Sequence, residues 1–96
     1  MEMRKKVHDM GRWLYLIADF SSGEEAIRQS LEAGIDYIQL REKEITSAKY
    51  LKRARRLREM TADFDTKLII NDRLDIAMLC DADGVHLGQS DIPVRD

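Results

Sequence analysis

Residues 36–43 read Asp-Tyr-Ile-Gln-Leu-Arg-Glu-Lys, a short apolar run that ends in polar side chains. Side chains alternate along an extended backbone, so Gln39, Arg41 and Lys43 are expected on one face and the apolar residues between them on the other. One amide and two cations at a strand end favour an anion with several oxygens, because Arg forks onto two oxygens and Lys supplies a point charge. The alternative is an ordinary solvated strand end.

Apolar runs of strand length lie on both sides of this stretch, separated by helical patterns. Strands are expected at 13–20, 36–40, 67–70 and 85–87, and helices at about 23–33, 47–60 and 74–80. Ser22 and Glu25 match a capping box for the first helix, and Gly34 is suited to ending it. Thr46 or Ser47 can cap the second helix. The sequence therefore alternates four strands with three helices through short connections.

This alternation predicts a parallel sheet with right-handed crossovers. Two architectures fit it, a small open α/β sheet or part of a (β/α)8 barrel. The polar residues collect at or just after the carboxyl ends of the strands, where parallel α/β folds keep their chemistry; they are Asp19, Gln39, Arg41, Lys43, Asn71, Asp72, Gln89 and Asp91. Residues 1–12 are polar and have no period, so we predict an N-terminal tail there.

Two aspartates follow neighbouring strands of the predicted sheet. Asp72 comes after the third strand and Asp91 after the fourth, so the two carboxylates can share one Mg2+, which prefers a couple of carboxylates together with substrate phosphate oxygens. The alternatives are structural. Asp72 would then be the N-cap of the third helix, and Asp91 an ordinary turn residue.

Composition limits the function classes further. With 44% apolar and 35% charged residues and a formal net charge of −2, the 96 residues fit one globular domain without a general affinity for nucleic acid. The cations of the helix at 47–60 are expected to form a solvated face, since they are spread around the outer side of an amphipathic helix and have Glu59 and Asp63 nearby. Cys80 lies in an apolar run and is expected to be a small core residue. The sequence contains neither a bilayer-length apolar stretch nor a secretion signal, so we expect a cytoplasmic protein.

Three motifs make a family resemblance specific. In order, the chain contains YLIAD, AGIDYIQLREKE and KLIINDRLDIAMLCDADGVHLGQSD. Together they closely resemble the thiamine phosphate synthase family, over nearly all of residues 13–96. The resemblance implies a (β/α)8 barrel that joins hydroxymethylpyrimidine diphosphate to thiazole phosphate and releases pyrophosphate, with Mg2+ as cofactor. This chain would hold four strands and three helices, about half of such a barrel.

The resemblance also assigns roles to residues by motif. Gln39, Arg41 and Lys43 of QLREK would contact the pyrimidine diphosphate, and Arg41 and Lys43 would neutralise the leaving diphosphate. In NDR, Asn71 would help to hold the diphosphate and Asp72 would bind the metal. Asp91 of HLGQSD would be the second metal carboxylate.

Two alternatives to an active synthase follow from the same resemblance. The related thiazole tautomerase shares the barrel but handles no diphosphate, so the presence of both Asp72 and Asp91 favours the synthase. A full barrel takes roughly 200 residues or more, so a truncated half-barrel that only binds ligand or self-associates is the other alternative. We expect the chain to pair with another copy or to be completed by a C-terminal half. The substrates are expected to be small molecules, with neither nucleic acid nor membrane as partner.

Overall fold

The computed structural model describes residues 2–8 and 11–88 of the chain. Its strands are β1 (Glu2–His8), β2 (Gly11–Ala18), β3 (Tyr37–Leu40), β4 (Lys67–Asn71) and β5 (Gly84–His86). Its helices are α1 (Glu24–Glu32), α2 (Ser47–Thr61) and α3 (Leu74–Leu79), and a short 3-10 helix, η1 (Phe20–Ser22), lies between β2 and α1. The predicted alternation of four strands and three helices is confirmed within these residues.

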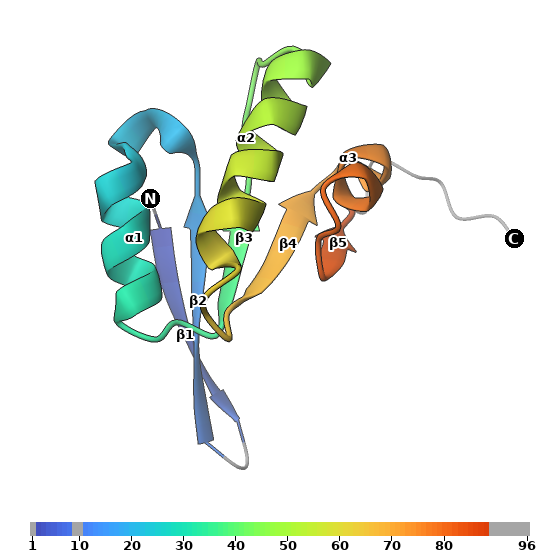
Figure 1. Cartoon of the computed structure of the whole chain (residues 1–96). Helices are drawn as coiled ribbons and strands as arrows, with labels where there is room; N and C mark the ends of the chain where they lie inside the picture. Colours follow the sequence, from blue (N-terminus) through green and yellow to red (C-terminus); the bar gives the residue numbers. More distant parts are fainter. Residues whose placement is uncertain (1, 9–10, 89–96) are drawn as a thin grey trace, which may run out of the picture.

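The strands form one sheet in the order β1-β2-β3-β4-β5 (Figure 1). Strands β2 to β5 are parallel neighbours, whereas β1 pairs antiparallel with β2, from Glu2 opposite Ile17 to His8 opposite Gly11. The prediction of an N-terminal tail over residues 1–12 is therefore wrong for Glu2–His8. An edge strand leaves a row of N–H and C=O groups unpaired, and β1 satisfies those of β2 through its backbone. Residues 2–8 lack the apolar run by which the other strands were predicted, so the sequence pattern did not indicate a strand there.

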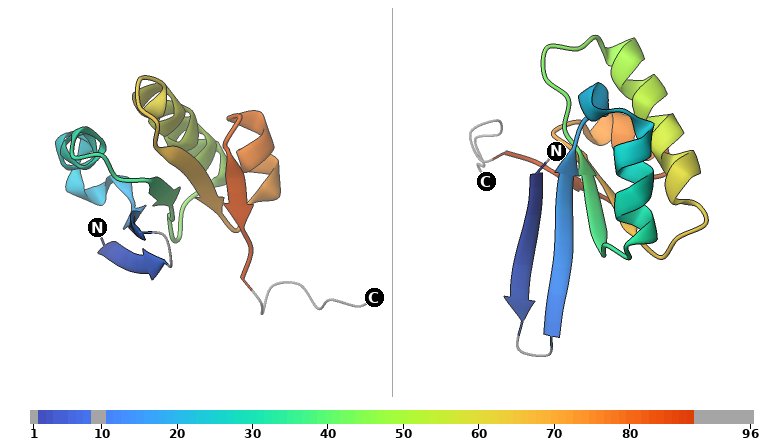
Figure 2. Two further views of the ribbon diagram at one scale, coloured as in Figure 1. Left: turned by 90° about the horizontal axis from the view of Figure 1, so that it is seen from below. Right: turned by 90° about the vertical axis from the view of Figure 1, so that its left-hand side faces the viewer.

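All three helices lie on the same face of the sheet (Figure 2). An open doubly wound sheet would carry helices on both faces, whereas a (β/α)8 barrel has all of its helices outside. The four parallel strands and three helices are therefore about half of such a barrel, as the sequence predicted. The uncovered face of the sheet corresponds to the interior of the barrel.

Alternating strand residues supply the core between sheet and helices. The residues of β2, β3 and β4 that face the helices are at most 2% exposed and pack against apolar residues of α1, α2 and α3. Burial of this apolar area is the main stabilising term for a sheet with one covered face. The core strand residues are Leu16, Ala18, Ile38, Leu40, Leu68 and Ile70, and the helix residues include Ile27, Leu31, Ala54, Leu57 and Ile76. Cys80 is buried in the same core, as predicted, and burial raises the pKa of its thiol.

Aspartates fix the amino ends of the strands. The Asp36 carboxylate accepts a hydrogen bond from the Leu14 N–H at 2.8 Å, and the Asp83 carboxylate accepts one from the Leu68 N–H at 2.7 Å. Each aspartate precedes one strand and binds the amide of the neighbouring strand. The polar residues at this end of the sheet therefore have a structural role.

The helix ends test the predicted caps. Thr46 is the N-cap of α2 and accepts a hydrogen bond from the Lys49 N–H at 3.2 Å, which confirms that prediction. Gly34 follows α1 with a φ of 87°, a left-handed conformation that suits glycine at a helix end. The predicted capping box at Ser22 is wrong, because η1 occupies that position and α1 begins at Glu24 after the N-cap Gly23.

Tyr50 on α2 joins the carboxyl ends of two strands. Its side chain is buried, and its hydroxyl donates a bifurcated hydrogen bond to the carbonyl oxygens of Leu40 at 3.0 Å and Asn71 at 2.8 Å. These residues are the last of β3 and β4. The phenol therefore fixes the points at which the loops after both strands begin.

We expect Tyr50→Phe to lower the free energy of unfolding at neutral pH by about 1–3 kcal/mol, because two buried carbonyls lose their donor. Burial raises the pKa of Tyr50 to about 12, so the folded protein holds this proton more tightly than the unfolded chain, in which the pKa is near 10. The contribution of the protonated Tyr50 hydroxyl to the free energy of unfolding is complete below pH ~10 and is lost as the pH rises towards 12. The stability difference between wild type and variant should therefore narrow over this range.

Urea unfolding followed by far-ultraviolet circular dichroism measures this difference at each pH. Titration of other groups affects wild type and Tyr50→Phe alike, so only their difference is used. A difference that stays constant from pH 10 to 12 would show that the phenol proton is not held by the fold.

Candidate functional site

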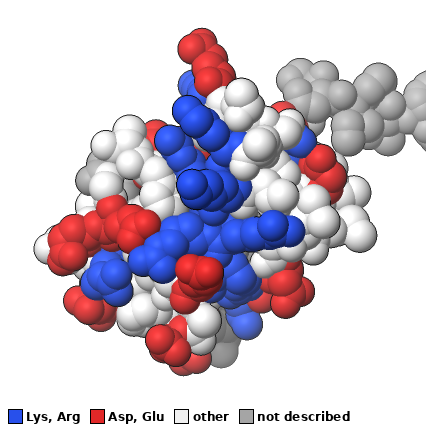
Figure 3. Space-filling model, turned by 45° about the horizontal axis from the view of Figure 1, so that its top comes forward, with Lys and Arg blue, Asp and Glu red and all other residues white. Residues whose placement is uncertain are grey.

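A hollow of about 490 Å3 opens at the carboxyl ends of β2 and β3. It is lined by Ile17, Ala18, Asp19, Ser21, Arg41, Glu42 and Lys43. Arg41 and Lys43 are exposed, and within residues 2–8 and 11–88 neither side chain makes a hydrogen bond or an ion pair. Lys and Arg side chains gather in the middle of the face that Figure 3 shows, with Asp and Glu side chains around and among them. The structure thus brings the two predicted cations together in one open hollow, which Asp19 and Glu42 also line.

Asp19 is the acidic residue of the hollow that comes from the loop after β2. One of its carboxylate oxygens accepts hydrogen bonds from the Ser21 hydroxyl and from the Ser21 N–H, the latter at 2.9 Å. The hydroxyl bond is the main reason why the pKa of Asp19 lies below its usual range. Asp19 is therefore an anion that caps η1 and lines the hollow together with the two cations.

Glu42 lies between the two cations in sequence but points away from the solvent. Its side chain is only 6% exposed and pairs with Arg53 of α2, with 2.9 Å between Oε1 and Nη1. Its other oxygen accepts a hydrogen bond from the Phe20 N–H at 3.0 Å. Arg53 thus balances the charge of Glu42, and the field of Arg41 and Lys43 remains available to a ligand.

Gln39 is separated from the cations with which the sequence grouped it. It is 4% exposed and does not line the hollow. Its Nε2 donates to the Tyr15 hydroxyl, and its Oε1 accepts a hydrogen bond from Asn71 Nδ2 at 2.8 Å. Tyr15, Gln39 and Asn71 therefore form a polar chain across β2, β3 and β4, on the face that carries no described helix (Figure 2). The structure brings Gln39 and Asn71 together, although not with Arg41 and Lys43.

Asp72 follows β4 directly. Its N–H donates to the His86 carbonyl oxygen at 2.6 Å, and its backbone is left-handed with a φ of 67°. The N-cap of α3 is Arg73, so the alternative that Asp72 caps this helix is wrong. In the described part of the chain the exposed Asp72 carboxylate has no hydrogen-bond or ion-pair partner.

Of the two predicted metal ligands, the structure describes Asp72. The free carboxylate is a hard oxygen donor of the kind that Mg2+ prefers, so Asp72 fits such a site. The second predicted ligand, Asp91, lies outside the described residues. Among the residues that are described, no group of three or more His, Cys, Asp or Glu side chains is arranged so that it could hold a metal ion.

Sequence reasoning missed the buried roles of Glu42, Tyr50 and Tyr15. The alternation that placed Arg41 and Lys43 on one face places Glu42 on the opposite, helix-covered face, and this signal was available. Tyr50 had a signal as well, because Tyr50, Ala54 and Leu57 are spaced by four and three residues, the period of the buried face of a helix. Tyr15 stacks on Tyr37 with ring centroids 5.7 Å apart, and this contact depends on the register of β2 against β3.

Nowhere in the described part of the chain does a helix have the length and the apolar character that crossing a bilayer requires.

Comparison with known proteins gives a consistent result. The family model described as thiamine monophosphate synthase matches residues 14–96. A thiamine-phosphate synthase of Clostridioides difficile is 47% identical over 88 residues, which cover 86% of this chain and 42% of that protein. One of Methanobrevibacter smithii is 44% identical over 86 residues, covering 85% and 41%. The chain spans about two fifths of the length of these relatives.

A solved structure agrees with this similarity. The thiamine phosphate pyrophosphorylase from Pyrococcus furiosus superposes with a TM-score of 0.74 at 34% sequence identity. The superposition covers 82% of this chain and 40% of that one. The fold described above is therefore similar to a matching part of a larger barrel.

The geometry of Asp72 predicts that its side chain contributes little to stability. In Asp72→Gly, relief of the left-handed backbone should offset the greater entropy of glycine in the unfolded chain, so the free energy of unfolding should stay the same or rise by up to about 1 kcal/mol. Thr46→Ala is the matched control, because it removes an observed cap and should cost about 1 kcal/mol. Urea unfolding measures both. A loss in Asp72→Gly as large as that in Thr46→Ala would mean that Asp72 has a structural role after all.

Proposed function

Because the chain belongs to the thiamine monophosphate synthase family, we propose that it supplies the diphosphate-binding part of a thiamine phosphate synthase. The proposed substrates are hydroxymethylpyrimidine diphosphate and thiazole phosphate, and the products are thiamine phosphate and pyrophosphate. One observation carries this proposal, namely that Arg41 and Lys43 line one hollow without partners in the described part of the chain. Both cations are therefore free to bind an anion.

The chemistry asks the protein to stabilise a leaving group. The C–O bond between the pyrimidine methylene and the diphosphate breaks, and its electron pair leaves with the diphosphate oxygen. The lone pair of the thiazole nitrogen then forms the new C–N bond to the methylene carbon. Arg41 forks onto two diphosphate oxygens and Lys43 adds a point charge, which lowers the energy of the departing anion. This reaction requires no protein nucleophile.

Gln39 and Asn71 bind substrate in this proposal. Their hydrogen bonds to each other and to Tyr15 hold both amides in fixed orientations. A preorganised amide loses little entropy when a ligand binds, so such a pair discriminates well between ring positions or phosphate oxygens. In this arrangement Gln39 contacts the pyrimidine diphosphate, and Asn71 helps to hold the diphosphate.

Asp72 and Asp91 would hold the Mg2+ ion of the proposed enzyme. When it is bound, Mg2+ neutralises charge on the diphosphate oxygens. The exposed, unpaired carboxylate of Asp72 supports this assignment, since a capping or ion-paired aspartate would have to give up a partner first.

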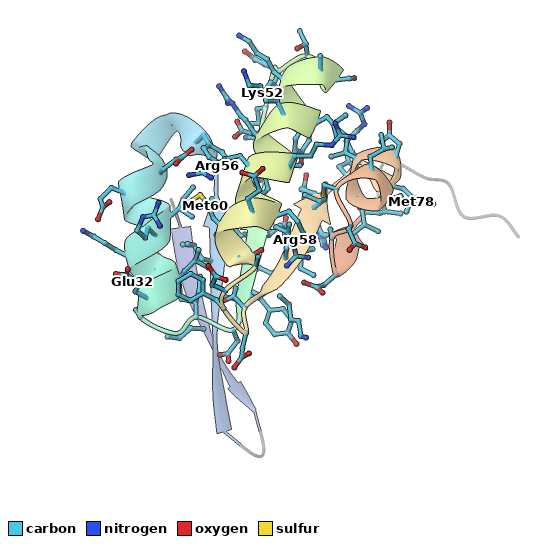
Figure 4. All side chains as sticks on the ribbon, viewed as in Figure 1. Glu32, Lys52, Arg56, Arg58, Met60 and Met78 are labelled. Carbon is cyan, nitrogen blue, oxygen red and sulfur yellow. The ribbon has the colours of Figure 1, made fainter. Side chains whose placement is uncertain are left out.

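The proposed activity also needs the remainder of the barrel. The apolar side chains Leu74, Met78, Leu79 and Leu87 are 40–74% exposed. The first three belong to α3, on which Figure 4 labels Met78, and Leu87 follows β5, the edge strand of the sheet. We infer that further strand–helix units cover this edge in the active enzyme, and that they hold the thiazole phosphate. The relatives described above carry the synthase name, so the tautomerase alternative is not favoured.

Pyrophosphate binding tests the role of the two cations. Arg41→Met and Lys43→Met each remove a charge-assisted contact worth about 1.5–3 kcal/mol, so the dissociation constant for pyrophosphate should rise about ten- to hundredfold. Lys52→Met is the matched control, because Lys52 is an exposed cation on the outer side of α2 (Figure 4). Isothermal titration calorimetry measures all four proteins. Equal losses in all three variants would indicate a general effect of net charge instead of a site.

Magnesium dependence tests the two aspartates. We expect Asp72→Asn and Asp91→Asn each to remove most of the increase in pyrophosphate affinity that wild type shows when magnesium chloride is added, because an amide binds this ion more weakly than a carboxylate. Asp65→Asn makes the same change at the opposite end of the sheet and should behave as wild type. If the magnesium effect survives in the first two variants, these carboxylates do not hold the ion.

A further inference from the structure

The loop after β3 contains an acidic residue whose charge opposes the proposed function. Arg41, Glu42 and Lys43 are consecutive, and by charge alone a carboxylate between two cations weakens any anion site that they form. Burying that carboxylate is also unfavourable unless it is paired and hydrogen-bonded. The interactions of Glu42 must therefore offset both of these unfavourable effects.

The contacts of Glu42 provide these interactions. Oε2 accepts the Phe20 N–H from the loop after β2, and Oε1 accepts Arg53 Nη1 from α2. These partners are 22 and 11 residues away in sequence. One carboxylate thus joins the two loops that line the hollow and anchors both to a helix whose own packing is fixed by the core.

The backbone reinforces this arrangement. The Arg41 N–H donates to the Ala18 carbonyl oxygen at 2.9 Å, immediately before Glu42. The Arg41 N–H and the Glu42 carboxylate thus fix two consecutive residues of this loop. Glu42 lines the same hollow as Arg41 and Lys43, so its contacts with Phe20 and Arg53 hold the backbone between the two cations.

We propose that Glu42, paired with Arg53, is a positioning residue that holds Arg41 and Lys43 in the orientation that binds diphosphate. This inference rests on the proposed function of the hollow as a diphosphate site. By its negative charge, the Glu42 carboxylate repels a bound anion. By holding Arg41 and Lys43 in place, the same carboxylate strengthens anion binding, and we infer that this second effect is the larger one.

The difference in sign makes a sharp experiment possible. Glu42→Gln keeps the size of the side chain and removes its charge, and the dissociation constant for inorganic pyrophosphate, measured by calorimetry, should rise roughly tenfold as the cations lose their alignment. Glu44→Gln is the matched control, because Glu44 is an exposed residue of the same loop with no hydrogen-bond or ion-pair partner among the described residues. This control removes the same charge, so its affinity should be unchanged or higher.

A second pair of variants leaves the net charge unchanged. Arg53→Lys should also weaken pyrophosphate binding, because the ammonium cannot reproduce the guanidinium contact with Glu42. Arg55→Lys changes an exposed residue of the same helix and should have no effect. Circular dichroism at the titration temperature establishes that each variant is folded, and if Glu42→Gln is not, the arginine pair decides.

The outcomes separate this inference from the proposed function. If wild type binds pyrophosphate and both Glu42→Gln and Arg53→Lys bind it as well or better, the positioning role is wrong and the diphosphate site stands. If wild type does not bind pyrophosphate at all, the proposed function is wrong and this inference is overturned with it.

Discussion

The hydrogen bond from the Tyr50 phenol to two strand ends is the contact on which the candidate site depends. A parallel sheet stops offering ladder partners where its strands end, so the last carbonyls must find other donors. Tyr50 satisfies Leu40 and Asn71 together from α2, in a place where burial excludes competing water. The loops that carry the candidate site residues begin at the next residues, Arg41 and Asp72. A single helix side chain therefore sets the origin of both loops, and the core that holds α2 indirectly holds the site.

The alternation of side chains along β3 separates the structural and functional roles of consecutive residues. Ile38 and Leu40 enter the helix-covered core, while Gln39 joins the polar chain on the other face. The same alternation continues beyond the last ladder pair, because the Glu42 carboxylate contacts Arg53 of α2, whereas Arg41 and Lys43 are exposed beside the hollow that all three residues line. The Arg41 N–H still donates to the Ala18 carbonyl oxygen of β2, and after it the contacts of Glu42 maintain this pattern. The loop after β3 thus extends the alternation of the strand beyond its last ladder pair.

Local signals were sufficient wherever the determining interaction was local. Thr46 bonds to an amide three residues away and Gly34 needs only its own φ, so both could be read from the sequence. The wrong predictions each involve a partner that is distant or unexpected. The 3-10 helix delays α1 beyond Ser22, and the amide of Asp72 is held by His86 on the neighbouring strand, which draws its backbone away from the capping geometry.

The pairing of side chains, more than the composition, determines the charge of the hollow. With 18 acidic and 16 basic side chains, the chain has enough acids to pair with every Lys and Arg. Three of the four arginines of α2 bind acids of other segments: Arg53 binds Glu42, Arg56 binds Glu24 of α1 through two contacts, and Arg58 binds Asp83 (Arg56 and Arg58 are labelled in Figure 4). The fork of Arg suits such contacts better than the ammonium of Lys. Glu42, which lies between Arg41 and Lys43 in sequence, is thereby paired with Arg53, and the two cations have no ion-pair partner in the described part of the chain.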